Sequence, residues 1–307
     1  MISSFRTRVR MNRMYRSPKD SIYMSKFFDE LCTGYSFYFG EEGEEDFYTV
    51  EPPDCKLSKR IFKQYHYDLS YRIEKVIDQV TYNLVAYGKA FVLIQPKYSL
   101  EKYCSNESIE LPSIDISAVD GFIKKKDKIN YVFCIRGYNG TTRDIEIQRK
   151  QLIMFDIKEL GYNKKHFANI LKKLEKCDIT AVSTSMLTND SNGYDYEVHS
   201  RIFKLKELRA TKDIGWMFGV DELSDSYILY KKIKADKLRM QFLQYILEKL
   251  NSGLCDFIGD SGGKIVAHVI EKNYDQLWKD YSDGKMTGTE LRNILYHNLE
   301  SSNNDVD

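Results

Sequence analysis

Histidine and cysteine are the side chains of this 307-residue sequence best suited to hold a metal ion. Neither type is clustered. The histidines lack the H-x-x-x-H or H-x-E spacing that directs two ligands of one helix to a common metal, and the cysteines form no C-x-x-C pair. They are His66, His166, His199, His268 and His297, and Cys32, Cys55, Cys104, Cys134, Cys177 and Cys255. The sequence therefore predicts no metal centre and no cofactor, and cysteines so spread favour reduced thiols in a cytoplasm.

The segment from Gly259 to Gly263 reads Gly-Asp-Ser-Gly-Gly, which is the sequence of the nucleophile loop of chymotrypsin-like serine proteases. Those enzymes place a base histidine and its aspartate far upstream, on an all-β framework rich in disulfides. This sequence is strongly helical, and His268 follows Ser261 too closely to copy that order. We interpret the segment as a turn.

Nucleotide and acid–base chemistry also lack their usual signatures. A phosphate-binding loop ending at Gly263-Lys264 would need glycine where Ile258 stands and a hydroxyl residue where Ile265 stands. The neighbours Asp221 and Glu222 could serve nuclease chemistry, but no second carboxylate cluster accompanies them in a recognisable order. We therefore expect a protein that is not an enzyme.

Basic clusters are the remaining chemical signal. Lysine and arginine number 46 against 45 acidic residues, so the net charge of +1 gives no argument for a polyanion ligand and any electrostatic case is local. An arm of five arginines without acidic residues opens the chain: Arg6, Arg8, Arg10, Arg13 and Arg16. Further clusters are Lys124–Lys126, Lys164-Lys165, Lys172-Lys173 and Lys231-Lys232. Each one alone is typical of a solvated face, but identical subunits directing them at one cavity would hold a polyanion through non-specific phosphate contacts.

The elements that would position these residues are clearest between 70 and 98. Apolar residues from Ile73 to Tyr87 recur at three- and four-residue intervals, which predicts an amphipathic helix. Gly88 follows where a helix commonly ends on a left-handed residue, and the apolar run 90–94 predicts a buried strand ending before Pro96.

The same patterns predict the other elements, although less distinctly. Helices are expected through Phe27 to Leu31 and over 167–174, 226–251, 274–281 and 289–299, with a stop near Gly253 for the helix at 226–251. Strands are expected at 35–39, 119–123, 131–136, 145–147, 152–155 and 265–270, with Asn139-Gly140 as a hairpin turn and 184–194 as a loop.

These elements predict an α+β fold in which long amphipathic helices pack on small, mainly antiparallel sheets. The expected divisions are a basic arm at 1–20, a helix and sheet core at 21–180, a loop-rich excursion at 181–225, a long helix with a helical region at 226–300, and a polar tail at 301–307. No apolar run approaches the roughly 20 residues that span a bilayer, so no membrane contact is expected.

The order of these elements resembles the core of tailed-phage portal proteins, the ring-forming subunits at the genome entrance of the capsid. The similarity lies in Val80 to Ile94, a helix, a Tyr-Gly-x-Ala-Phe motif and a strand, and in the strand Leu152 to Asp156 after a small β region. A looser similarity covers Ala210 to Trp216 and the long helix ending at Asn251. The resemblance covers about two thirds of the chain.

This resemblance implies a homo-oligomeric ring that passes double-stranded DNA by non-specific phosphate contacts and docks packaging or connector proteins, in the host cytoplasm and then in the virion. It carries over no catalytic residue. The long helix would be a channel-side element, with Lys231, Lys232, Lys234, Lys237 and Arg239 as phosphate neighbours beside the arginine arm. Two alternatives remain open: a cytoplasmic anti-phage or mobile-element defence protein binding nucleic acid or a phage component, possibly as a nuclease, and a plain interaction subunit.

Overall fold

A computed structural model describes residues 22–39, 47–62, 69–97, 113–136, 141–163, 165–186, 196–216, 224–259, 262–270 and 272–300. The chain divides into two units, each assembled from separate stretches of sequence rather than from the consecutive segments predicted above. Unit 1 comprises residues 1–33, 163–240 and 272–307, and unit 2 comprises residues 34–162 and 241–271. Within the described ranges the α+β class is confirmed.

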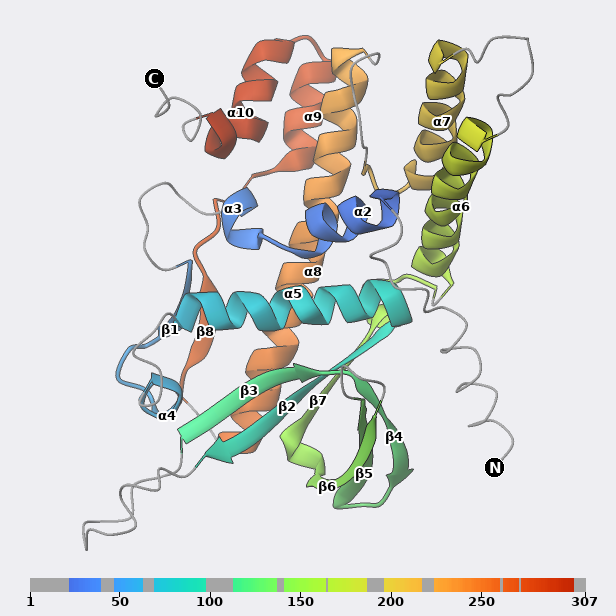
Figure 1. Cartoon of the computed structure of the whole chain (residues 1–307). Helices are drawn as coiled ribbons and strands as arrows, with labels where there is room; N and C mark the ends of the chain where they lie inside the picture. The colour runs from blue at the N-terminus through green and yellow to red at the C-terminus, as the bar shows by residue number, and fades with distance from the viewer. Residues whose placement is uncertain are drawn as a thin grey trace, which may run out of the picture. The chain divides into compact units, whose positions relative to one another are not determined.

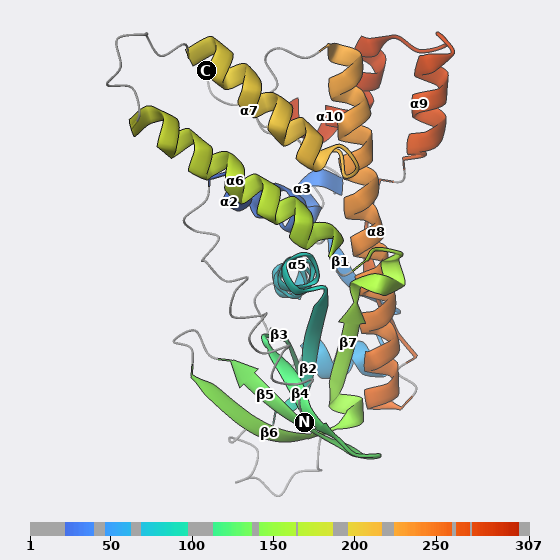
Figure 2. The same ribbon diagram turned by 90° about the vertical axis from the view of Figure 1, so that its right-hand side faces the viewer.

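The regular elements in the described part of unit 1 are helices. Its helices are α2 (Ile22–Cys32), α6 (His166–Met186), α7 (Tyr196–Thr211), the first half of α8 (Asp225–Ile258), α9 (Tyr274–Ser282) and α10 (Gly288–Glu300). Helices α6 and α7 lie side by side, as Figures 1 and 2 both show. A core formed by Leu229, Ile233, Tyr274, Leu291 and Leu295 joins α8 to α9 and α10. The region 181–225, predicted to be loop-rich, is largely helical where it is described, because α6 continues to Met186 and α7 follows.

Unit 2 contains the strands and the helices packed on them. Its elements are α3 (Tyr35–Phe39), β1 (Tyr48–Glu51), α4 (Lys56–Phe62), α5 (Leu69–Tyr87), β2 (Lys89–Lys97), β3 (Ser113–Val119), β4 (Gly121–Lys126), β5 (Asn130–Arg136), β6 (Thr142–Gln148), the 3-10 turn η3 (Arg149–Gln151), β7 (Leu152–Asp156), the 3-10 turn η4 (Ile157–Leu160), the second half of α8 and β8 (Lys264–Ala267). The described strands form antiparallel sheets of order β1-β8, β3-β2-β7 and β4-β5-β6. The strands predicted between 119 and 155 fall into two of these sheets, because β7 pairs with β2 while β5 pairs with β4 and β6.

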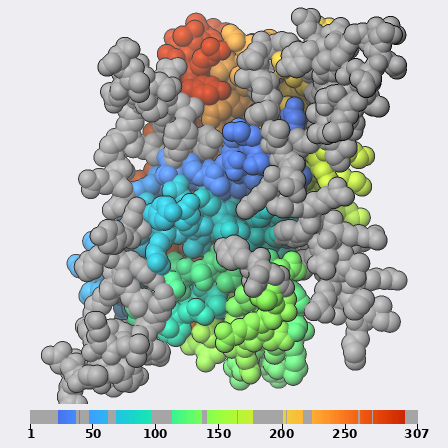
Figure 3. Space-filling view, viewed as in Figure 1, coloured from blue at the N-terminus to red at the C-terminus, as the bar shows by residue number. Residues whose placement is uncertain are grey.

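Helix α5 and strand β2 form the unit that the sequence predicted most clearly. Gly88 has a φ of 72° and its N–H donates to the carbonyl of Leu84 at 2.8 Å, which ends the helix. Strand β2 starts at the next residue, and α5 packs on it with Ile73, Ile77, Val80 and Leu84 wholly buried. In Figure 3 the cyan surface that includes α5 lies directly against the green surface of segments further along the chain. This part of the prediction is confirmed.

Strand β2 continues through Pro96, contrary to the prediction. Its pairing with β7 ends at Leu93, while its pairing with β3 continues to Lys97 and places Pro96 opposite Ile114. Among the described strands, therefore, only β3 pairs with β2 beyond Leu93. A proline without an N–H is tolerated at such an edge.

The segment Tyr35–Phe39 is helix α3, so the predicted strand was wrong. Tyr35 and Phe39 are 0% and 2% exposed, and their ring centroids lie 6.4 Å apart. A spacing of four residues places both aromatic side chains on one helical face. A run of aromatic residues suits a buried helix as well as a strand, and the packing of Tyr35 on α5 favours the helix.

Helix α8 extends beyond Gly253, which was predicted to end it; Gly259, with a φ of 68°, follows its last residue. A Cβ on Gly253 would lie 2.4 and 2.5 Å from Cγ1 and Cδ1 of Ile153 in β7. The glycine thus allows helix and strand to approach closely.

We expect Gly253→Ala to lower the free energy of unfolding by about 1–3 kcal/mol, because the added methyl overlaps Ile153. In an Ile153→Ala background the same change should become neutral or stabilising by up to about 1 kcal/mol, since alanine favours a helix over glycine. Denaturant unfolding of the four proteins of this double-mutant cycle measures the difference. An equal effect of Gly253→Ala in both backgrounds would contradict the explanation.

Candidate functional site

Several residues chosen from the sequence lie outside the described ranges. They are Arg6, Arg8, Arg10, Arg13 and Arg16 of the arm, Asp221, Glu222, Lys164, the Asn139-Gly140 turn, and Asp260 and Ser261 of the Gly-Asp-Ser-Gly-Gly segment. Near that segment, His268 bonds through Nε2 to Thr49 Oγ1 at 2.8 Å. Among the described residues no group of three or more histidine, cysteine or acidic side chains is placed to hold a metal ion. None of the described helices combines the length and apolar composition that spanning a membrane requires.

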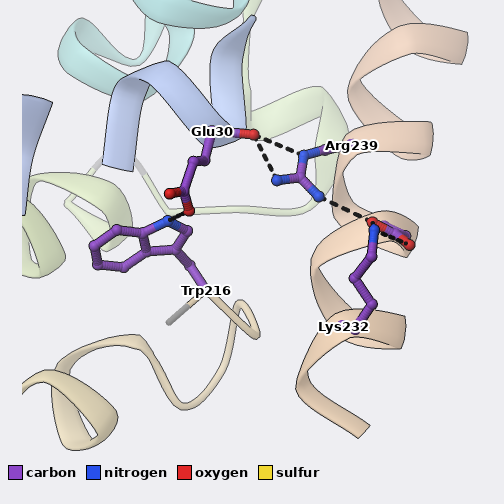
Figure 4. Close-up of polar contacts among 5 residues, drawn as sticks. Glu30, Trp216, Lys232 and Arg239 are labelled. Atoms are coloured by element: carbon purple, nitrogen blue, oxygen red, sulfur yellow. Dashed lines mark hydrogen bonds and ion pairs between the residues drawn. The ribbon is translucent and has the colours of Figure 1, made fainter. Parts of the chain in front are cut away.

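The basic residues of α8 form a network inside unit 1, drawn in Figure 4. Lys232 Nζ donates to Asp236 Oδ1 and Oδ2 at 2.7 and 2.8 Å, and Arg239 Nη1 donates to the same Oδ1 at 2.9 Å. The side chains of Asp236 and Arg239 are 4% and 5% exposed. One buried carboxylate therefore neutralises two cations that stand one turn away on the same helix.

Arg239 also donates hydrogen bonds to a backbone carbonyl at the C-terminal end of α2. Its Nε and Nη2 donate to the carbonyl oxygen of Glu30 at 2.8 and 2.5 Å. Glu30 lies in the last turn of α2, where carbonyl groups have no partner within their own helix. The guanidinium thus links the C-terminal turn of α2 to α8.

The carboxylate of Glu30 accepts a hydrogen bond from Trp216. Trp216 Nε1 donates to Glu30 Oε2 at 2.7 Å, and the Trp216 ring packs edge-on against Phe27 of α2 with centroids 5.3 Å apart. Burial raises the pKa of Glu30, while the bond from Trp216 and the charge of Arg239 oppose that rise. Glu30 therefore joins α2 both to Trp216 and to Arg239 of α8, as Figure 4 shows.

Lys231 is 1% exposed, and its Nζ donates to the carbonyl oxygen of Thr211 at 3.2 Å. Thr211 is the last residue of α7, so this lysine satisfies a carbonyl at a second helix end. Burial lowers the Lys231 pKa to about 8, and the nearby positive charge of Lys234 contributes to that lowering.

These contacts correct the prediction that Lys231, Lys232 and Arg239 are phosphate neighbours. Lys231 and Arg239 are buried, and the Lys232 side chain is 12% exposed. The charged atoms of all three are bonded within the protein, and bringing them to a phosphate would break those bonds. Lys234 lies over the Tyr230 ring at 4.8 Å, and Lys237 pairs with Asp275 at 2.6 Å. Both keep partly exposed side chains, so phosphate contact by these two stays a prediction.

Unit 2 contains a basic surface cluster that sequence reasoning missed. Arg60 of α4 and Lys150 of η3 each place a cation 5.8 Å from the centre of the Phe257 ring near the end of α8. We call these three residues the Phe257 cluster. Its members are about 90 and 107 positions apart in sequence, so no local pattern indicated that they meet. A cation on an aromatic face keeps its charge while the ring holds it in place.

The predicted lysine cluster at 124–126 has ordinary surface surroundings. Lys124 pairs with Asp144, Lys125 with Asp127, and Lys126 lies over the Tyr131 ring. Exposed pairs of this kind contribute little to stability and leave the charges accessible to solvent.

Comparison with known proteins places the chain in no family. No family model matches it, and no curated protein matches its sequence. Among solved structures, the chain is similar to one from the neck of a native GTA particle computed with C12 symmetry. That similarity covers 89% of each chain at 10% sequence identity, with a TM-score of 0.36.

Proposed function

We propose that this chain is a non-enzymatic, ring-forming portal-like subunit that passes double-stranded DNA and docks packaging or head-completion proteins. In this role it would act in the host cytoplasm and then in the virion. The observation that supports the proposal is the α5–Gly88–β2 unit, which contains the Tyr-Gly-x-Ala-Phe segment that resembles portal proteins. The strand Leu152–Asp156, named in the same resemblance, pairs directly with β2.

The proposal is tested first by the mass of the purified full-length chain in solution. Light scattering after size exclusion should give a closed ring of many copies, and class-averaged electron micrographs should show one axis of rotational symmetry. A monomer or dimer at physiological salt would contradict the proposal. DNA cleavage that requires a divalent metal and is lost on changing Asp221 or Glu222 would favour a nuclease instead.

Binding of DNA should depend on the arginine arm. We consider the variant in which glutamine replaces Arg6, Arg8, Arg10, Arg13 and Arg16 together. It should bind DNA more weakly, and the negative slope of log affinity against log salt should become shallower by about 0.9 for each phosphate that the arm no longer neutralises. Fluorescence anisotropy with a short duplex at several salt concentrations measures both quantities. An unchanged slope would reject a DNA-binding role for the arm.

The Phe257 cluster supplies a second test within the same assay. If both cations bind phosphates, the double variant Arg60→Gln with Lys150→Gln should make the negative slope of log affinity against log salt shallower by about 1–2. Lys285→Gln is the matched control, because this lysine is a surface cation that pairs with Asp280 and Asp283. Equal slopes for the two variants would remove the cluster from the DNA-binding surface.

A further inference from the structure

A row of aromatic side chains follows the seam between α8 and α9 in unit 1. The rings of Tyr230 in α8 and Trp278 in α9 have centroids 4.9 Å apart, and those of Trp278 and Tyr281 lie 5.6 Å apart. At one end of the row Tyr281 Oη lies 2.5 Å from Ser226 Oγ, and at the other end Lys234 Nζ lies 4.8 Å from the centre of the Tyr230 ring. We call these five residues the Trp278 ladder.

The ladder is regular because both helices present residues at helical spacing. Ser226, Tyr230 and Lys234 are four residues apart on α8, so they share one face of that helix. Trp278 and Tyr281 are three residues apart on α9. The α8 residues meet the α9 residues in reverse order, which makes the two helices antiparallel along the seam.

The ladder keeps an accessible side. Trp278 and Tyr281 pack against the core that joins α8 to α9 and α10, yet both rings and that of Tyr230 are partly exposed. The rings are tilted by 49° and 46° and are not stacked flat. No described residue accepts a hydrogen bond from the Trp278 indole N–H, whereas the Trp216 indole donates to Glu30. The ladder therefore offers ring surface and an unused donor.

The surface charges beside the ladder are paired within the protein. Lys237 pairs with Asp275 at 2.6 Å, and Arg292 pairs with Asp225 at 2.9 Å. Such a surface holds little net charge for a polyanion. Proline-containing segments suit it better, because proline rings pack on aromatic side chains and their carbonyl groups accept hydrogen bonds without an N–H beside them.

An exposed segment of unit 2 has this chemistry. Between β1 and α4 the chain reads Glu51-Pro52-Pro53-Asp54, and all four residues are exposed. The strand before them is paired with β8, and the N–H of Cys55 donates to the Pro52 carbonyl at 3.1 Å, so the segment has a fixed support at both ends. Its two carboxylates complement the positive charge of Lys234. A segment that is already ordered loses little entropy on binding.

We propose that the segment Glu51–Asp54 of one copy docks on the Trp278 ladder of the next copy. Each chain then contributes one surface of each kind, and a head-to-tail contact of this type closes into a ring when its rotation allows. This inference rests on the ring-forming function proposed above and names one contact that would build the ring.

Self-association of the full-length protein tests the contact. Trp278→Ala, and separately Pro52→Ser combined with Pro53→Ser, should each weaken association at least about tenfold, because a few aromatic anchors dominate the energy of most interfaces. Sedimentation velocity over a concentration series measures the change. Tyr71→Ala is the matched control, since Tyr71 is a 55% exposed aromatic residue on α5 outside both surfaces. This variant should associate as the wild type does.

Mixing the variants shows whether the two surfaces meet. At a concentration where each variant alone is monomeric, an equimolar mixture should form a 1:1 complex, because the proline variant keeps the ladder and Trp278→Ala keeps the prolines. If circular dichroism shows that Trp278→Ala folds poorly, Lys234→Glu takes its place. This substitution removes no ring from the core and repels the two carboxylates of the segment.

The outcomes separate this contact from the function on which it rests. A wild-type ring that neither the ladder variants nor the proline variant weakens would overturn the contact and leave the ring standing. Association that these variants weaken, but that gives open chains and no ring, would support the contact and count against a portal-like subunit. A wild type that stays monomeric would overturn both, and a mixture that forms no complex would overturn the contact.

Discussion

Asp236→Ala should lower the free energy of unfolding by about 3–5 kcal/mol, because it leaves two buried cations without their shared partner. Lys232 and Arg239 both donate to this carboxylate, whose side chain is 4% exposed. Burial already lowers the pKa of Lys232 and the charge of Asp236 opposes that effect, so removing Asp236 lowers it again. Urea unfolding followed by circular dichroism measures the loss.

The matched control is Asp275→Ala. Asp275 also accepts from an α8 lysine, Lys237, at 2.6 Å, but its side chain is 83% exposed. An exposed pair contributes at most about 1 kcal/mol. Similar losses in the two variants would show that burial of the Asp236 network does not set its energy.

Gly215→Ala is expected to have the second large effect. Gly215 has a φ of 80°, where an alanine costs about 1–2 kcal/mol. Its Cβ would also lie 2.4 Å from the backbone oxygen of Lys231 and 2.5 Å from Lys234 Cβ. Overpacking of this kind costs about 1–3 kcal/mol more, so the total should be about 2–5 kcal/mol.

Gly284→Ala separates the two contributions. Gly284 has a similar φ of 72° and no atom within 4 Å of its would-be Cβ, so this variant should lose only the conformational part. Thermal unfolding of both variants gives the comparison. If Gly284→Ala lowered the free energy of unfolding as much as Gly215→Ala does, the close approach of Gly215 to α8 would not contribute to the loss of stability.

The sequence predicted the fold best where local patterns and packing agree. The period of α5 and the glycine after it define the helix and its end without knowledge of the partner strand. The errors arose where tertiary contact decides. Gly253 resembles a helix stop but serves contact with Ile153, and Pro96 is tolerated only because β7 pairs no further than Leu93.

The candidate site was less predictable for the same reason. A lysine-rich helix has the same composition whether its cations face solvent or helix ends, and the burial of Lys231 depends on where α7 ends. The Phe257 cluster joins residues separated by about 90 or more positions. Period and composition describe one segment at a time, so this meeting was not visible in them.

The use of α8 cations at the ends of α2 and α7 has a consequence for how unit 1 assembles. Before those two helices dock, Arg239 and Lys231 lack their carbonyl acceptors, so a collapsed intermediate would have to desolvate them without compensation. Partial forms of the unit are thereby disfavoured relative to both the unfolded chain and the completed bundle. We expect its refolding to be cooperative, with the three helices gaining protection from hydrogen exchange together.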